Sequence, residues 1–149
     1  MLPLRMHVIA GAIALGLIPA LAIAEQIGEI KLAKGDVVIT RGAQTIQAAE
    51  GTPLELQDIV ATGENSVVGM TFTDEARVSL GPNSELALET YVYKGKGDAE
   101  NSFDSRLTKG SMSAASGLIA KTGPDTMRVL MPTTVLGVRG TEFAVRIDE

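Results

Sequence analysis

Short stretches of alternating apolar and polar residues, separated by turn-forming residues, run from Ile27 onward and constrain the fold more than any other feature. The turns recur roughly every eight to twelve positions, which is the spacing of strands in an all-β domain. Glycine, proline and asparagine supply the backbone angles that such turns need. The segments are IGEIKL (27–32), VVIT (37–40), DIVAT (58–62), SVVGMTF (66–72), ARVSL (76–80), ELALETYVY (85–93), SFDSRL (102–107) and TMRVLM (126–131).

We predict a single all-β domain over residues 25–149, with almost no helix. Its short strands should pack as a two-layer sandwich or a flattened β-roll, and a solenoid-like stacking of turns is the alternative. In ELALETYVY the alternation puts Tyr91 and Tyr93 on the face of Glu89, away from Leu88. The predicted core comprises Ile30, Val38, Val68, Met70, Phe72, Val78, Leu80, Leu86, Leu88, Phe103, Leu107, Val129, Leu136, Val138, Phe143 and Val145.

The first 24 residues have the pattern of a secretory signal peptide. Arg5 and His7 give a positive start, residues 8–21 are almost entirely apolar, and Ala22-Ile23-Ala24 is a small-x-small cleavage site. We expect cleavage before Glu25, a periplasmic or secreted product and no stable membrane anchor after cleavage. The alternative is an uncleaved anchor, but a membrane-spanning helix needs about 20 apolar residues, and this stretch is shorter and contains Pro19.

The residue types that are missing restrict the chemistry. The chain has no cysteine or tryptophan, and its single histidine, His7, lies in the predicted signal peptide. Metal sites built on imidazole or thiolate, and Ser-His-Asp or Cys-His catalytic groups, are therefore excluded after cleavage. The net charge of −5 argues against a nucleic-acid partner, which needs a basic surface. We expect no cofactor, no metal and no enzymatic activity.

Carboxylates leave two further possibilities open. Asp58 and Asp74 could form a glycosidase-like acid pair, but both adjoin turns, where aspartate ordinarily accepts hydrogen bonds from backbone amides. The loop GKGDAEN (95–101) carries Asp98, Glu100 and Asn101 without the alternating oxygen ligands of a calcium loop. We favour the structural interpretation in both cases.

The segment VLGVRGTEFAV, Val135 to Val145, contains a one-residue slip in its apolar alternation. Apolar residues fall on even positions up to Val138 and on odd positions from Phe143, so an inserted residue at Gly140 is expected, as a bulge or turn. Arg139, Gly140 and Thr141 could form an anion site from the arginine and the turned amides. An ion pair between Arg139 and a nearby carboxylate is the favoured alternative.

The same segment resembles the closing motif of the FecR domain family, and Leu56 to Leu88 resembles that family's central signature. The likeness begins near Gly28 and Gly35. Gln57 and Glu75 depart from it, since glycine is frequent in the family at both positions. The resemblance implies an extracytoplasmic domain related to regulators that carry signals from outer-membrane iron-chelate transporters. Those regulators span the membrane, whereas we expect a signal peptide at the start of this chain, so the resemblance implies the extracytoplasmic module alone.

We therefore expect a non-enzymatic module that binds a protein or a cell-envelope component, with a role in envelope signalling. The alternative is a glycan-binding module in which Tyr91 and Tyr93 stack on sugar rings. Arg139, Gly140 and Thr141 are the other candidate binding residues.

Overall fold

All regular structure in the described residues is β-strand, which confirms the predicted all-β class. The computed structural model describes residues 3, 11, 16–19, 23–140 and 142–148. Most of the apolar stretch 8–21, on which the signal-peptide prediction rests, lies outside them. In the described part of the chain, no helix is long and apolar enough to cross a membrane.

The strands are β1 (Gln26–Lys34), β2 (Val37–Arg41), β3 (Gln44–Gln47), β4 (Pro53–Glu55), β5 (Ile59–Thr62), β6 (Val67–Phe72), β7 (Arg77–Leu80), β8 (Glu85–Val92), β9 (Ser102–Ala115), β10 (Met127–Met131), β11 (Thr134–Gly137) and β12 (Glu142–Ile147).

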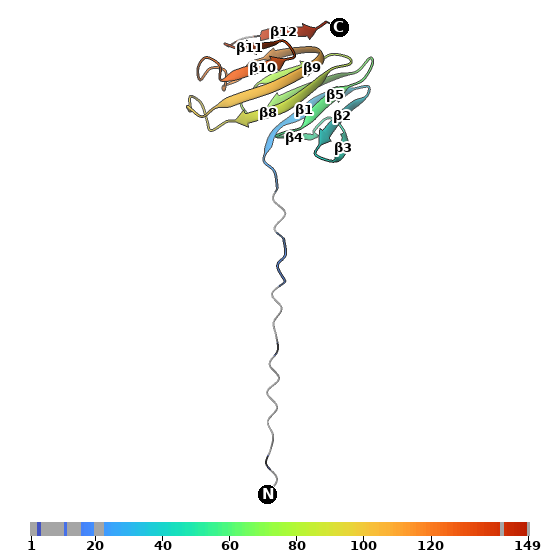
Figure 1. The fold of residues 1–149 in the computed structure, drawn as a ribbon, viewed down its shortest axis with the longest axis vertical. Helices are drawn as coiled ribbons and strands as arrows, with labels where there is room; N and C mark the ends of the chain where they lie inside the picture. Colours follow the sequence, from blue (N-terminus) through green and yellow to red (C-terminus); the bar gives the residue numbers. More distant parts are fainter. Residues whose placement is uncertain (1–2, 4–10, 12–15, 20–22, 141, 149) are drawn as a thin grey trace.

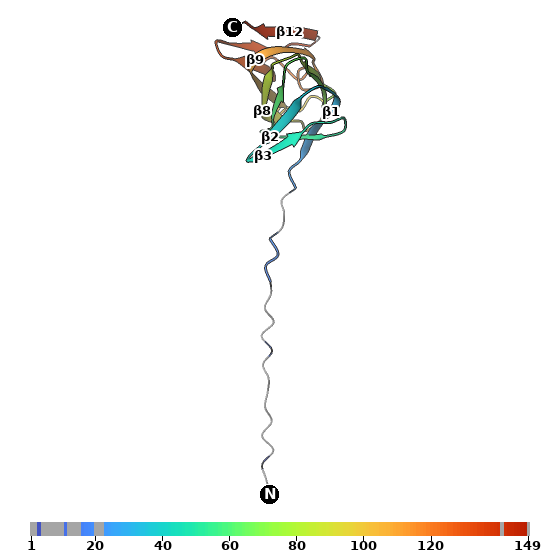
Figure 2. The ribbon, with the colours of Figure 1, turned by 90° about the vertical axis from the view of Figure 1, so that its right-hand side faces the viewer.

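The strands form one open, curled sheet around a shared core (Figure 1). Its main path runs β3-β2-β5-β8-β9-β7-β6-β1-β4. The long strand β9 belongs to both halves. Its first part pairs with β8 and, in parallel, with β10, while its second part pairs with β7 and β12. Figure 2 shows the curl end-on. The two layers expected from the sequence are therefore halves of a single sheet, joined by β9.

β9 passes from one half to the other at Gly110. The φ of this residue, +84°, lies in a region that L side chains rarely adopt. A Cβ atom here would lie 2.1 Å from Ser84 Oγ. That oxygen accepts a hydrogen bond from the backbone N–H of Ser111 at 2.9 Å. Glycine is required at this position because both the backbone angle and the close approach of Ser84 exclude a side chain.

Most of the predicted core residues are buried, and the errors have local causes. Val38 is half-buried, while its neighbours Val37 and Ile39 point into the core. Three consecutive apolar residues carry no alternation, so the sequence could not show which of them face inward. Buried residues that the prediction missed include Leu54, Val60, Met112, Ile119 and Met127.

The predicted orientation of Tyr91 is wrong because β8 contains a bulge. Its register against β9 shifts between Leu88 and Thr90, and this shift places Tyr91 opposite the buried Phe103. Directly opposite residues in an antiparallel pair share a face. Tyr91 therefore turns toward the core and packs against it, as does Tyr93.

The one-residue slip in apolar alternation between Val138 and Phe143 lies between two strands. β11 pairs with β10, whereas β12 pairs with the second part of β9, so the chain changes sheet halves at the slip. Gly140 lies in this link with a φ of +41°, which confirms the predicted turn. Phe143 then returns to the core side. Leu136, Phe143 and Val145, predicted as core, are only half-buried because β11 and β12 lie at sheet edges.

Candidate functional site

A shallow groove lies on the outer face of the half-sheet that contains β7, β9 and β12. Ser79, Ser113 and Ala144 form its floor and are exposed, whereas their strand neighbours Leu80 and Met112 are buried in the core. The floor joins two hollows, of about 610 and 660 Å³. We call this surface the outer groove; it is lined by Leu32, Val67, Arg77, Ser79, Ser111, Ser113, Ala115, Glu142, Ala144, Arg146 and Asp148.

Strand register produces the groove. Ser113 of β9 lies opposite Ser79 on one side and opposite Ala144 on the other, so three small side chains form a row across the sheet. In the next row, Ala115 lies between Arg77 and Glu142. Small residues flanked by longer charged ones leave a depression in which the main chain is close to the surface.

The groove offers hydroxyl groups and charged side chains with which a bound molecule could form hydrogen bonds and ion pairs. The serine hydroxyls can donate and accept hydrogen bonds. The charged side chains at the margin have both signs: Arg77 and Glu142 line one hollow, and Arg146 and Asp148 line the other. Among the described residues, no group of three or more His, Cys, Asp and Glu could hold a metal ion.

The structure separates the two sets of residues predicted as binding sites. Arg139 is exposed in the link between β11 and β12, beside a hollow of about 170 Å³ that Leu136 and Phe143 also line. Thr141 lies outside the described residues. Within the described part of the chain, Arg139 forms no ion pair, so the favoured pairing with a carboxylate has no partner there. The anion-site hypothesis stays a prediction.

Tyr91 contributes to an internal hydrogen-bond cluster. Its hydroxyl donates to Asp74 Oδ1 at 3.0 Å and accepts from the Asp74 N–H at 2.9 Å. Its ring packs against Phe72 and Phe103, with centroids 5.7 and 5.0 Å away. Burial raises the pKa of the Tyr91 hydroxyl above its usual range, which keeps it protonated as a donor. The ring and hydroxyl are thus already engaged within the protein.

Asp58 and Asp74 accept backbone hydrogen bonds at turns, as the structural interpretation predicted. Asp58 accepts from the N–H of Glu55 at 2.9 Å and forms a two-bond pair with Arg41, with both N–O distances 2.8 Å. The hydrogen bond to Asp58 raises the pKa of Arg41. Asp74 accepts from the N–H groups of Ala76 and Ile119, both at 3.2 Å. Both carboxylates are fully buried and serve to join strands and loops.

The residues of the 95–101 loop also bond to one another. Asp98 accepts the N–H of Glu100 at 2.9 Å, and Asn101 Oδ1 accepts the N–H of Lys94 at 2.9 Å. Lys94 in turn forms an ion pair with Glu100. These contacts close the loop on itself.

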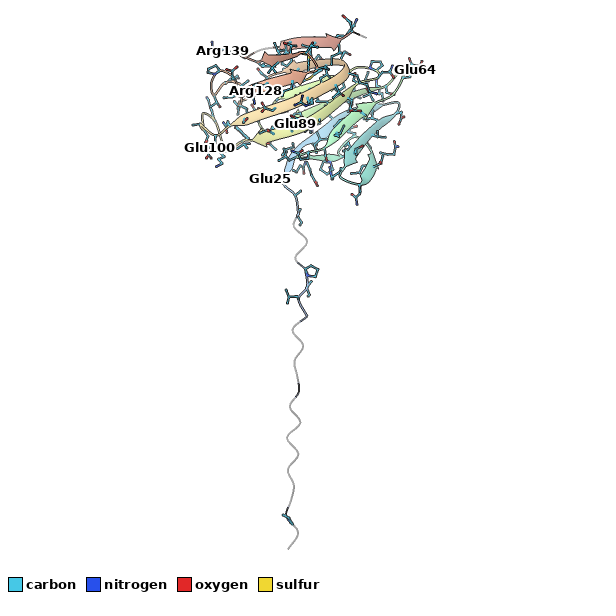
Figure 3. All side chains as sticks on the ribbon, in the orientation of Figure 1. Glu25, Glu64, Glu89, Glu100, Arg128 and Arg139 are labelled. Atoms are coloured by element: carbon cyan, nitrogen blue, oxygen red, sulfur yellow. The ribbon has the colours of Figure 1, made fainter. Side chains whose placement is uncertain are left out.

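The outer face of the other half-sheet carries charges in cross-strand pairs. Arg106 on β9 pairs with Glu89 on β8, and Arg128 on β10 pairs with Asp104 at 2.6 Å. Figure 3 shows Glu89 and Arg128 on the strands that flank β9. The outer groove therefore differs from this face, because it carries a row of small residues where this face carries cross-strand ion pairs.

The groove was missed from the sequence, although one signal for it was present. In SMSAAS (111–116), serines alternate with Met112 and Ala114, which marks one face as small and polar. What the sequence could not show is that Ser79 and Ala144 lie beside that face. Their alignment follows from pairings between strands far apart in the chain.

Comparison with known proteins agrees with the earlier resemblance. The family model described as FecR protein matches residues 58–149, a span that includes β5 to β12. No match was found among curated proteins or among solved structures. The match covers more than half of the chain and nearly all of the outer groove, so the chain belongs to the FecR family.

Proposed function

We propose that this protein is a non-enzymatic extracytoplasmic module that binds a protein partner through the outer groove. The FecR family is involved in envelope signalling, and its members are regulators. The groove is the single observation that carries the proposal, because it is a broad depression with accessible main chain and hydroxyls on the matched part of the fold.

The chemistry of the groove favours a protein over other partners. Its margin carries cations and anions together, and its end near Leu32 and Val67 adds apolar surface, with Leu32 44% exposed. Protein interfaces combine apolar and polar area in this way. A polyanion would instead require a basic surface, and the chain as a whole carries a net charge of −5. A role for Tyr91 and Tyr93 in glycan binding stays a prediction that the internal contacts of Tyr91 do not favour.

A variant that fills the groove tests the proposal. Ser113→Arg places a long charged side chain on the exposed floor, so we expect it to leave the melting temperature nearly unchanged and to abolish co-purification of the partner after in-cell crosslinking. Thr108→Arg is the matched control, because Thr108 is exposed on the same strand outside the groove. Equal partner recovery with Ser113→Arg and with the unmodified protein would contradict the proposal.

A further inference from the structure

One edge of β12 is available for pairing with a further strand. It is bonded to β9 on one side, and no described strand pairs with its other side. Its register against β9 runs without a shift from Glu142 to Ile147, and the strand contains no proline. Bulges, prolines, very short strands and charged side chains are the usual means of blocking an edge. β12 has none of the first three, and its two charged side chains have opposite signs.

The inner face of this edge is incompletely covered. Phe143, Val145 and Ile147 pack against the core but remain half-exposed. The outward face carries Glu142, Ala144 and Arg146 in alternation, so an acid and a base flank a small residue. A strand paired with this edge would cover the three apolar side chains and meet those two charges.

We infer that β12 pairs with β12 of a second copy of this chain, antiparallel and about a two-fold axis at Ala144. In this register Glu142 lies opposite Arg146 of the second copy, and symmetry repeats the contact. On the inner face, Phe143 lies opposite Val145 of the second copy. The sequence EFAVR is thus complementary to itself when it runs antiparallel.

Neighbouring registers are less favourable. A shift of one residue places exposed side chains opposite half-buried ones, which breaks the two-faced pattern. A shift of two residues in one direction places Glu142 opposite Asp148, and like charges in opposed positions are destabilising. A shift of two in the other direction leaves Arg146 opposite Gly140, without an acidic partner. Charge therefore selects the register centred on Ala144.

The resulting dimer would join two curled sheets into one continuous sheet, with the two outer grooves side by side. This inference goes beyond the proposed function and does not depend on it, because the purified protein alone is sufficient for its test.

Charge reversal is the first arm of the test. By sedimentation velocity over a concentration series, we expect a reversible dimer. Glu142→Arg and Arg146→Glu should each weaken it at least about tenfold, since two attractive contacts become repulsive. An equimolar mixture of the two variants should restore the dimer, because each then meets the opposite charge. Glu64→Arg and Lys96→Glu, which change exposed charges in loops, are the matched controls.

The second arm uses the absence of cysteine in the chain. Ala144→Cys places two thiols opposite each other at the two-fold axis, where the spacing of paired residues suits a disulfide after small adjustment. It should form covalent dimers at least about tenfold faster than Asp148→Cys, an exposed position away from the axis, because pairing raises the effective thiol concentration. A protein that stays monomeric at all concentrations, a dimer indifferent to the charge reversals, or equal crosslinking at both positions would overturn the inference.

Discussion

Gly140 is the residue on which the change of sheet halves depends. Its φ is +41°, and among the described residues, apart from its chain neighbours, no heavy atom lies within 4 Å of the place where a Cβ would stand. Gly140→Val should therefore destabilise through backbone strain alone, by about 1–3 kcal/mol in urea unfolding. Arg139→Ala should leave stability nearly unchanged, because Arg139 is exposed. A Gly140→Val protein as stable as its parent would show that the link does not need this angle.

The turn residues Gln57 and Glu75 show that the family resemblance carries information about backbone angles. Gln57 and Glu75 stand where glycine is frequent in the family, and both adopt positive φ, +71° and +73°. The turns keep the backbone angle that glycine would adopt freely, although the side chains differ. Composition alone would not have placed these residues there, since L side chains seldom take such angles. The inward turn of Tyr91 was equally unpredictable, because the bulge that causes it leaves no mark on the alternation of residues.

At the scale of elements, the segment 116–126 meets the Asp74 turn at a close approach of Gly117. A Cβ at Gly117 would lie 2.3 Å from the carbonyl oxygen of Asp74, which accepts the N–H of Leu118 at 2.8 Å. Gly117→Ala should cost about 1–3 kcal/mol, because backbone must move on both sides of the contact. Gly123→Ala in the same segment is the control, since its nearest new contact is 3.9 Å away. Equal melting temperatures for the two variants would contradict this account.

Strand positions were largely predictable, whereas strand partners were not. The alternation located β6, β7 and most of β8 because one face of each is buried. The parallel pairing of β10 with β9, by contrast, brings Met127 beside Phe103 after the chain has crossed the fold. Such pairing depends on the whole assembly of strands, so local pattern carries no signal for it. The short strands β3 and β4 were missed because each contains a single apolar residue, Ile46 and Leu54, so neither shows an alternation.

At the scale of the molecule, the fold extends beyond the part that matches the family. β1 pairs with β6, and β2 pairs with β5, yet both β1 and β2 precede residue 58. A chain of residues 58–149 would expose two long edges and leave the buried Asp58 without Arg41. We expect it to lack a cooperative thermal transition by circular dichroism, whereas residues 25–149 should melt cooperatively. A cooperative melt of the shorter chain would show that the first strands are dispensable.

The location of the groove tests the functional account most directly. A photo-crosslinking amino acid at Ser79, on the groove floor, should capture a discrete protein partner in cells, and Ser113→Arg in the same chain should remove that product. The same probe at Thr45, exposed on β3 in the other half-sheet, should capture none. The account predicts crosslinking at Ser79 that depends on an open groove. Crosslinking to the partner from Thr45 and not from Ser79 would contradict it.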